Sequence, residues 1–184
     1  PPVENLWRFT QAGVDAVLFS GGKDLRGPQA SGLVLGKQDF MKHLEKIGFP
    51  NYGIGRMGKA GREELTGLLN AGEEYVSMDH AGREERCEAD VRSVVEAFRD
   101  SPVLEAHRSF PNEAGQPLPR AVVSVRPGVN SGLDAASLCA GLLRSTPAVY
   151  VHPADERGVF INPMTLDDRE IEIVIEHLKR LAAE

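Results

Sequence analysis

The stretch GVDAVLFSGGKDLRGPQASGLVLGKQDF, residues 13–40, decides how the N-terminal part of the chain folds. Its two short apolar runs, residues 14–20 and 31–37, are bounded by glycines, which is typical of buried β-strands. Between them lie a Gly-Gly pair and a Gly-Pro pair, and both are turn signals. The stretch therefore predicts two strands joined by a tight loop, and this loop carries a single lysine, Lys23.

After this stretch the pattern predicts helices. Residues 38–48 form a predicted short helix, and the glycine-rich residues 51–61 form a connector. Residues 62–76 and 83–100 carry apolar side chains at helical spacing, so they predict one long helix, or two helices with a break near residues 79–82. In the first of these segments the expected apolar face consists of Leu65, Leu68, Leu69 and Val76.

The C-terminal part predicts a small α+β sandwich. Strands are expected over residues 103–110 and 120–128 around a Gly/Pro-rich turn, and a hairpin over residues 148–163. Helices are expected over residues 131–146 and 165–184, and helices would cover one face of an antiparallel sheet. In the first of these helices we expect Leu133, Ala136, Ala140 and Leu143 to point inward. In the last we expect Thr165 or Asp167 as N-cap and a buried stripe of Ile171, Val174, Ile175, Leu178 and Leu181.

Three parts of the chain follow from this pattern. Residues 1–50 are expected to be the last strands of a larger α/β sheet. Residues 51–100 are expected to form a linker and a long helix, and residues 101–184 a small α+β domain. The predicted fold class is therefore α/β plus α+β.

The composition argues against several classes of protein. A net charge of −6 disfavours binding to nucleic-acid phosphates, so we expect no nucleic-acid partner. Cys87 and Cys139 lie far apart without a CxxC motif, which suits a reducing cytoplasm. No apolar run approaches the roughly 20 residues of a membrane span. The five histidines lack metal-binding spacing, so we expect no metal site.

Three interpretations of Lys23 are open. A phosphate loop of the NTPase type needs a glycine five residues before its Gly-Lys pair and Ser or Thr after it, and Val17 and Asp24 stand at these places instead. A second interpretation is a polar turn with an exposed lysine, because lysines are usually exposed. The third is a Schiff-base lysine, which must be neutral to react and whose pKa is lowered by burial or by a neighbouring cation.

The residues around Lys23 suit the third interpretation. Glycines allow a cofactor to approach the backbone closely. The Ser20 hydroxyl and the N–H groups of Gly21 and Gly22 could bind a phosphate, and Arg26 adds a cation. Pyridoxal phosphate is a cofactor that joins an aldehyde, for the lysine, to a phosphate, for such a site.

At these residues the sequence resembles a known family. Residues 13–40 resemble the lysine segment of the selenocysteine-synthase-like branch of fold-type-I pyridoxal-phosphate enzymes. This branch includes L-seryl-tRNA(Sec) selenium transferase and the D-glucosaminate-6-phosphate ammonia-lyase-like enzymes. The segments GIGRMGKAGREELTGLL, residues 53–69, and GVFINPMTLDDREIEIVIEHL, residues 158–178, look like the entry into the small domain and its closing hairpin and last helix.

The resemblance implies roles for individual residues. Lys23 would be the Schiff-base lysine and the base that moves the substrate α-proton, and Ser20 would bind the cofactor phosphate. Gly27 would lie near the cofactor at a subunit boundary, because such enzymes build sites across a dimer. Arg56 is the candidate for binding an anion on the substrate.

The resemblance also implies a function and a missing part. The chain would be the C-terminal half of a lyase or transferase that acts on an amino acid or amino-sugar acid by aldimine formation, α-proton abstraction and β-elimination. An N-terminal half or a second polypeptide would supply the rest of the site, in a cytoplasmic homo-oligomer. The alternative is a non-catalytic oligomerisation or regulatory module derived from such an enzyme.

Overall fold

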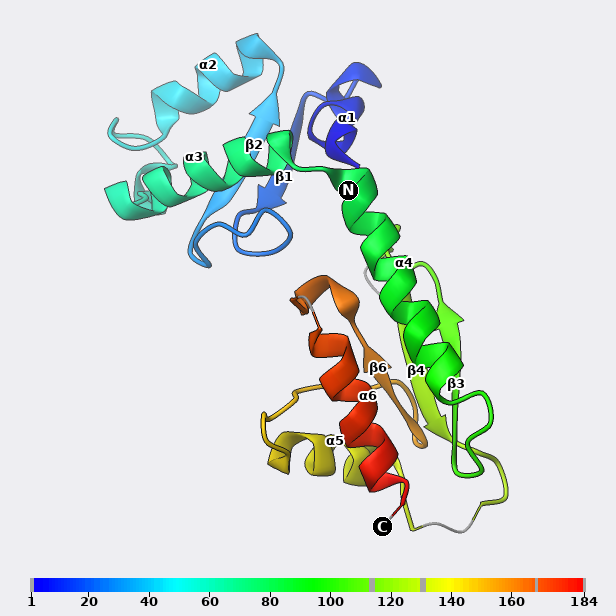
Figure 1. Ribbon diagram of the computed structural model, residues 1–184. Helices are drawn as coiled ribbons and strands as arrows, with labels where there is room; N and C mark the ends of the chain where they lie inside the picture. Colours follow the sequence, from blue (N-terminus) through cyan, green and yellow to red (C-terminus); the bar gives the residue numbers. More distant parts are fainter. Residues whose placement is uncertain (1, 113–114, 130–131, 168, 184) are drawn as a thin grey trace. The chain divides into compact units, whose positions relative to one another are not determined.

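The computed structural model describes residues 2–112, 115–129, 132–167 and 169–183 and divides the chain into two compact units (Figure 1). Unit 1 comprises Pro1–His80 and unit 2 comprises Ala81–Glu184. The domain assignment made from the sequence, with boundaries at residues 50 and 100, remains a prediction. Parts of the expected Gly/Pro-rich turn (113–114) and of the expected helices (131, 168 and 184) lie outside the described residues.

Unit 1 is built around one β-hairpin. Its elements are η1 (Val3–Leu6), α1 (Arg8–Gln11), β1 (Ala16–Ser20), β2 (Gly32–Gly36), α2 (Gln38–Ile47), η2 (Arg56–Gly58) and α3 (Arg62–Ser77). β1 and β2 are antiparallel, with Ala16 opposite Gly36 and Ser20 opposite Gly32. The two strands, the loop between them and the short helix that follows are therefore confirmed.

The expected burial of these strands was wrong. No residue of β1 or β2 is buried, and Leu18 is largely exposed. A sheet of two strands has little of its surface covered, and such a hairpin is marginal by itself. Most of the exposed large hydrophobic side chains among the described residues lie in unit 1, whereas its buried apolar side chains are Leu25, Ala71 and Tyr75.

Unit 2 is a four-stranded antiparallel sheet with three helices. Its elements are α4 (His80–Ala97, whose first residue belongs to unit 1), β3 (Leu104–Ser109), β4 (Arg120–Val125), α5 (Ala135–Arg144), β5 (His152–Pro153), β6 (Gly158–Ile161), η3 (Pro163–Thr165) and α6 (Glu170–Leu181). The strand order is β3-β4-β6-β5, and neighbouring strands are antiparallel. The predicted order of helices and strands is confirmed, and the break between α3 and α4 at residues 78–79 resolves the long segment into two helices.

The core of unit 2 lies between the sheet and its helices. Ala121, Val123 and Val125 alternate along β4, so they point to the same face of the sheet. The helices supply buried side chains to the same cluster, and Figure 1 shows α4 and α6 lying along the sheet. These helix residues are Val91, Val94, Leu138, Leu142, Ile171, Val174 and Leu178. Helices covering one face of an antiparallel sheet are therefore confirmed.

The inward face of α5 differs from the prediction. Leu138 and Leu142 are fully buried, whereas Ala136 and Leu143 are exposed. The helix begins after Asp134, whose carboxylate accepts the Ser137 N–H in a capping box. Leu142 and Leu143 are adjacent near the end of the helix, so the apolar pattern is consistent with either leucine facing the core. Packing against the sheet buries Leu142 and leaves Leu143 exposed.

The start of α6 also differs from the prediction. Its N-cap is Arg169, with a left-handed φ of 69°, so neither Thr165 nor Asp167 caps the helix. Thr165 lies in η3, and the Asp167 N–H donates to the Glu170 carboxylate at 2.9 Å. Ile171, Val174 and Leu178 of the predicted stripe are buried, and Ile175 and Leu181 are half-buried.

Candidate active site

The lysine loop, defined as residues 21–31, connects β1 to β2 and is closed by backbone hydrogen bonds. The Gly21 N–H donates to Ser31 O at 2.9 Å, which extends the strand pairing by one step. The Gly27 N–H donates to Gly21 O at 2.8 Å, which folds the middle of the loop back onto its start. The loop is therefore fixed at both ends, and Lys23 lies between these fixed points.

Glycine is required at the start of this loop because other groups approach the backbone closely. A Cβ at Gly21 would clash with Ser31 Oγ and would lie 2.9 Å from Leu68 Cδ1. A Cβ at Gly22 would lie 2.6 Å from Gln29 Cα, and the Gln29 side-chain amide donates to Gly22 O at 3.1 Å. These contacts leave no room for a side chain at either glycine.

The loop also packs against helix α3. A Cβ at Gly27 would lie 3.3 Å from Leu68 Cδ1, and one at Gly67 would lie 2.7 Å from Pro28 Cγ. Leu25 is one of the few buried apolar side chains of unit 1. Two close contacts with α3 and one buried leucine thus hold the loop that carries the lysine.

Lys23 itself is exposed, which differs from the sheltered position that we expected. Among the described residues, no acceptor engages its Nζ. By contrast, Lys37 Nζ donates to Gly13 O at 3.0 Å and to the Asp15 carboxylate at 2.8 Å. The exposure has a simple reason, since β1 and β2 form a sheet of only two strands and have no further strand beside them in the described chain.

The predicted phosphate-binding residues differ in the groups that they offer. Ser20 is the last residue of β1, and its side chain is exposed. The Gly21 N–H donates to Ser31 O inside the loop, and its expected donation to a phosphate remains a prediction. Arg26 adopts a left-handed φ of 58°, and its N–H donates to Lys23 O at 2.8 Å. Groups that remain available for a cofactor are those of Ser20, Gly22 and Lys23 and the guanidinium of the exposed Arg26.

Arg56, the predicted substrate-binding residue, belongs to unit 1 as does Lys23. Its guanidinium carbon lies 4.9 Å from the ring centroids of both Phe49 and Tyr52. One of its N–H groups donates to Pro50 O at 3.2 Å. Stacking on two rings orients a planar guanidinium, and the free edge of such a group can bind a carboxylate or phosphate with two hydrogen bonds.

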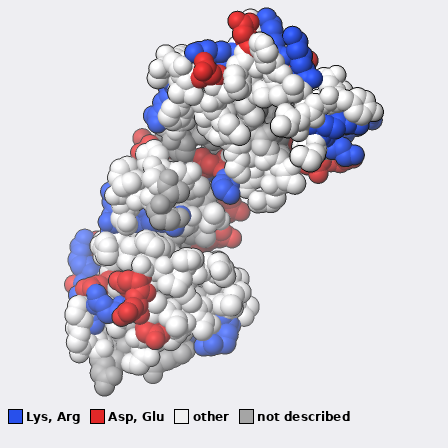
Figure 2. Space-filling model, turned by 180° about the vertical axis from the view of Figure 1, so that it is seen from behind, with Lys and Arg blue, Asp and Glu red and all other residues white. Residues whose placement is uncertain are grey.

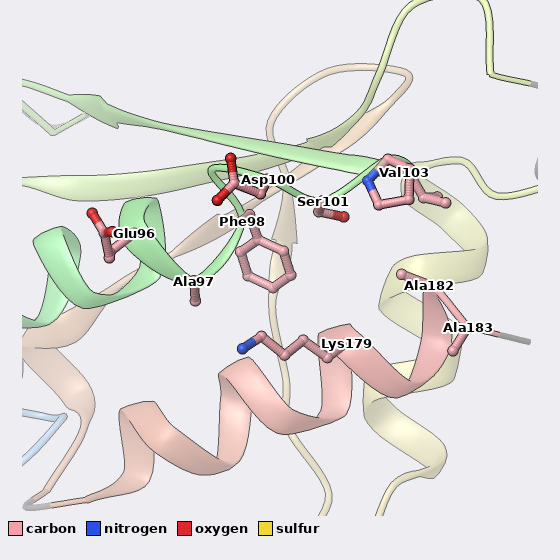
Figure 3. A pocket seen from close by; sticks show the side chains of 10 residues that line it. Glu96, Ala97, Phe98, Asp100, Ser101, Val103, Lys179, Ala182 and Ala183 are labelled. Atoms are coloured by element: carbon pink, nitrogen blue, oxygen red, sulfur yellow. The ribbon is translucent and has the colours of Figure 1, made fainter.

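Unit 2 contains a hollow of about 500 Å³ near the C-terminal ends of α4 and α6 (Figure 3). The Glu96 and Asp100 carboxylates and the Lys179 ammonium line it, around the ring of Phe98. Helix C-termini carry partial negative charge, and two carboxylates outweigh one ammonium. This hollow is therefore unsuited to the phosphate of a cofactor.

A smaller cavity of about 210 Å³ in unit 2 has the opposite character. Arg120, His152 and Asn162 line it together with apolar side chains, and the Arg120 guanidinium lies 5.7 Å from the Phe160 ring centroid. Arg120 was not among the site residues predicted from the sequence. A signal was present, because this arginine begins a strand whose other residues, apart from Ser124, are apolar, but strand ends are often charged for solubility alone.

Other kinds of site have little support in the described parts of the chain. No group of three or more His, Cys, Asp and Glu side chains there could bind a metal ion. Burial raises the pKa of both the Cys87 and the Cys139 thiols, which disfavours a nucleophilic thiolate.

On the face seen in Figure 2, Lys and Arg are interspersed with Asp and Glu instead of forming one basic area. No helix in the described residues is long and apolar enough to cross a membrane.

Comparison with known proteins gives a consistent result. No family model matches the chain. D-glucosaminate-6-phosphate ammonia lyase of Salmonella typhimurium is 29% identical over 184 residues, which cover 97% of this chain and 46% of that enzyme. A 5'-C-glycyluridine monooxygenase-decarboxylase of a Streptomyces species is 27% identical over 178 residues, which cover 96% of this chain and 43% of that protein.

Solved structures give the same picture. A structure of D-glucosaminate-6-phosphate ammonia-lyase matches with a TM-score of 0.70 and 26% identity, over 99% of this chain and 47% of that one. A cysteine desulfurase of Escherichia coli matches with a TM-score of 0.59 and 14% identity, over 94% of this chain and 47% of that one, and this likeness concerns the fold alone.

These matches define the class: the chain has the fold of about half of a fold-type-I pyridoxal-phosphate enzyme, as the sequence predicted. Within that class the chain is homologous to D-glucosaminate-6-phosphate ammonia-lyase. It spans about half the length of the curated relatives that it matches.

Proposed function

We propose that the chain is the lysine-bearing half of a pyridoxal-phosphate-dependent lyase or transferase that acts on an amino acid or an amino-sugar acid. The observation that carries this proposal is Lys23, an amine without a partner among the described residues, on a loop fixed by the Gly21 and Gly27 hydrogen bonds. The homology to D-glucosaminate-6-phosphate ammonia lyase supports elimination chemistry and an amino-sugar acid substrate. No comparison favours a non-catalytic module.

The residues of the lysine loop fit one side of a pyridoxal-phosphate site. Lys23 would bond covalently to the aldehyde carbon as the Schiff-base lysine, and the Ser20 hydroxyl and Gly22 N–H would donate to the phosphate. Gly21 and Gly27 would contribute through their lack of a side chain, which keeps the loop close to α3. When bound, the cofactor supplies an electron sink for the charge that develops at the substrate α-carbon.

The chain's own residues would then move and orient groups of the substrate. Once the substrate amine has replaced it at the aldehyde carbon, Lys23 is a free amine, and its Nζ would accept the α-proton as general base. The electron pair left at the α-carbon forms the double bond to the β-carbon, and the β-substituent departs with its bonding pair. Arg56, oriented by Phe49 and Tyr52, binds an anionic group of the substrate and so positions the α-proton relative to Lys23.

The site is incomplete in this chain. The remainder would come from the part of the enzyme outside the matched region, in the same or in a second polypeptide, and the active form would be a homo-oligomer, most simply a dimer. We place the enzyme in the cytoplasm, which suits its two free cysteines.

The proposal is tested by covalent trapping. The chain and its complementary half are incubated with stoichiometric pyridoxal phosphate, reduced with borohydride, and mapped by mass spectrometry. The label is expected on Lys23, and Lys23→Ala should lose both the label and the absorbance of lysine-bound cofactor. Lys37→Ala is the matched control, because Lys37 is an exposed lysine of the same hairpin that is paired with Asp15. Labelling spread equally over several lysines would contradict the proposal.

A further inference from the structure

Unit 1 carries an apolar groove of about 850 Å³. We define the groove by the side chains of α3 and β2 that line it, namely Leu65, Leu68, Leu69, Val76, Leu33 and Leu35. Glu73 is the charged side chain among its lining residues. Five leucines, one valine and a single carboxylate resemble the composition of a protein interior. In the described chain, however, these side chains face solvent.

The α3 side of the groove is the feature that requires an explanation. Leu65, Leu69 and Val76 are 58%, 63% and 57% exposed. They belong to the apolar stripe that the sequence predicts, and such a stripe marks the buried face of a helix. Large exposed apolar patches on a soluble protein mark interaction surfaces. The stripe is therefore a helix face whose partner is not among the described residues.

The shape of the groove suits a helix as its occupant. Gly72 lies in the groove wall, and a Cβ there would find no atom within 4 Å. A glycine flanked by Leu69 and Val76 leaves a notch on the helix surface. Side chains of a second helix can enter such a notch, as ridges of one helix pack into grooves of another.

The neighbouring sheet points to the same kind of occupant. In the described residues β1 pairs with β2 alone, so the outer edge of each strand has unpaired backbone groups. An open edge beside an apolar groove is a surface on which the further strands and a helix of a larger α/β domain would pack. The curated relatives contain more than half of their length outside the region that this chain matches.

We propose that the groove is the docking surface for the remainder of the α/β domain, which places the apolar face of one helix along α3. This inference rests on the proposed function, because it assigns the surface on which the complementary half of the enzyme binds. The occupant is an amphipathic helix of that half, with one apolar face for the leucines and a polar or basic position opposite Glu73.

The association is tested without cofactor. The 184-residue chain is co-expressed with the part of the Salmonella ammonia lyase that lies outside the matched region, and that enzyme's own two parts serve as positive control. We expect co-purification, and protection of the α3 amides from hydrogen exchange in the complex. The double variant Leu65→Asp, Leu69→Asp should weaken the association about tenfold or more. Leu143→Asp, an exposed leucine of unit 2, should leave it unchanged.

Several results would overturn the inference. One is a wild-type chain that does not associate when the control parts do, and another is a groove variant that associates as well as the wild type. A third is a dimer of the chain alone that the double variant makes monomeric, because a second copy would then occupy the groove. If the control parts fail to associate, hydrogen exchange of the chain alone decides. If the α3 amides are as protected from exchange as those of α4, the groove needs no partner and the inference is overturned. If the α3 amides exchange fast while those of α4 are protected, the inference is supported.

Failure of this inference is distinguishable from failure of the proposed function. A Lys23→Ala chain should associate as well as the wild type, because Lys23 does not line the groove. A wild-type chain that associates normally but is not labelled at Lys23 would contradict the catalytic role alone. Intact labelling at Lys23 with the groove variants associating normally would contradict the docking surface alone.

Discussion

The Gly21 N–H donates a 2.9 Å hydrogen bond to Ser31 O, and this bond closes the loop that carries Lys23. The same glycine lies against α3, where a Cβ would come 2.9 Å from Leu68 Cδ1. One residue thus links the strand pairing of the hairpin to the helix behind it. The orientation of the lysine depends on this link together with the contacts that Gly27 and Pro28 make with α3.

Replacing Gly21 should therefore loosen the loop. In Gly21→Ala the new methyl group meets Ser31 Oγ and Leu68, and overpacking of this kind costs about 1–3 kcal/mol. We expect a lower urea midpoint by fluorescence of Trp7, which is the sole tryptophan of the chain and belongs to unit 1. Labelling of Lys23 by pyridoxal phosphate should fall as well. Gly58→Ala is the control, because a Cβ at Gly58 meets no atom within 4 Å. An unchanged midpoint in Gly21→Ala would refute the packing argument.

Arg56 provides a prediction about the substrate. Lysine cannot stack as a plane on Phe49 and Tyr52, and it cannot form two parallel hydrogen bonds to an anion. Arg56→Lys should therefore raise KM for an amino-sugar acid by about tenfold or more, with a smaller change in kcat. Steady-state kinetics of the complete enzyme measures both constants, and Arg62→Lys on the exposed start of α3 is the control. A fall in kcat with KM unchanged would assign Arg56 a different role.

The adjacent leucines of α5 distinguish the two possible phases of that helix. Leu142 is fully buried in the core of unit 2, whereas Leu143 is 55% exposed. Leu142→Ala should lower the free energy of unfolding of unit 2 by about 2–5 kcal/mol, because it leaves a cavity in the core. Leu143→Ala should change it by less than about 0.5 kcal/mol. Urea unfolding followed by far-UV circular dichroism measures both values, and equal losses would mean that the helix is rotated from the position described.

An ion pair in unit 2 predicts a pH dependence. Arg108 donates to both oxygens of Glu88, from Nε at 3.2 and 2.9 Å and from an Nη at 2.6 Å. These side-chain hydrogen bonds lower the pKa of Glu88. A carboxyl whose pKa is lowered in the folded state stabilises the protein above its ordinary pKa, and this stabilisation is lost as the pH falls through the lowered value.

Glu88→Gln should therefore unfold at lower urea than the wild type near neutral pH, and the difference should vanish in acid below the pKa of Glu88. Urea midpoints measured across this pH range test the prediction. Glu85→Gln, an exposed change on the same helix, should follow the wild type at every pH. A difference between Glu88→Gln and wild type that persists in acid would show that the hydrogen-bonding shape of the side chain, and not its charge, matters.

Much of the chain could be predicted from local pattern. The hairpin around residues 154–158 and the helix with Val174 and Leu178 inward follow from turn residues and from a spacing of 3.6, and both are confirmed. The phase of α5 could not be predicted, because Leu142 and Leu143 fit equally well until the strands that α5 packs against are in place. The N-cap of α6 was missed because Arg169 adopts a backbone conformation that non-glycine residues rarely take.

The sequence by itself determined the order of helices and strands, the loop that presents Lys23, and the homology to pyridoxal-phosphate enzymes. These depend on neighbours within a few residues, or on a pattern shared with related chains. Only the tertiary structure decided which side chains are buried, that the Gly21 N–H is used inside the loop, and that Lys23 is exposed. The physical reason is that burial and hydrogen-bond partners depend on segments distant in sequence, as Val123 meets Val159 across the sheet and Gly21 meets Leu68 on α3.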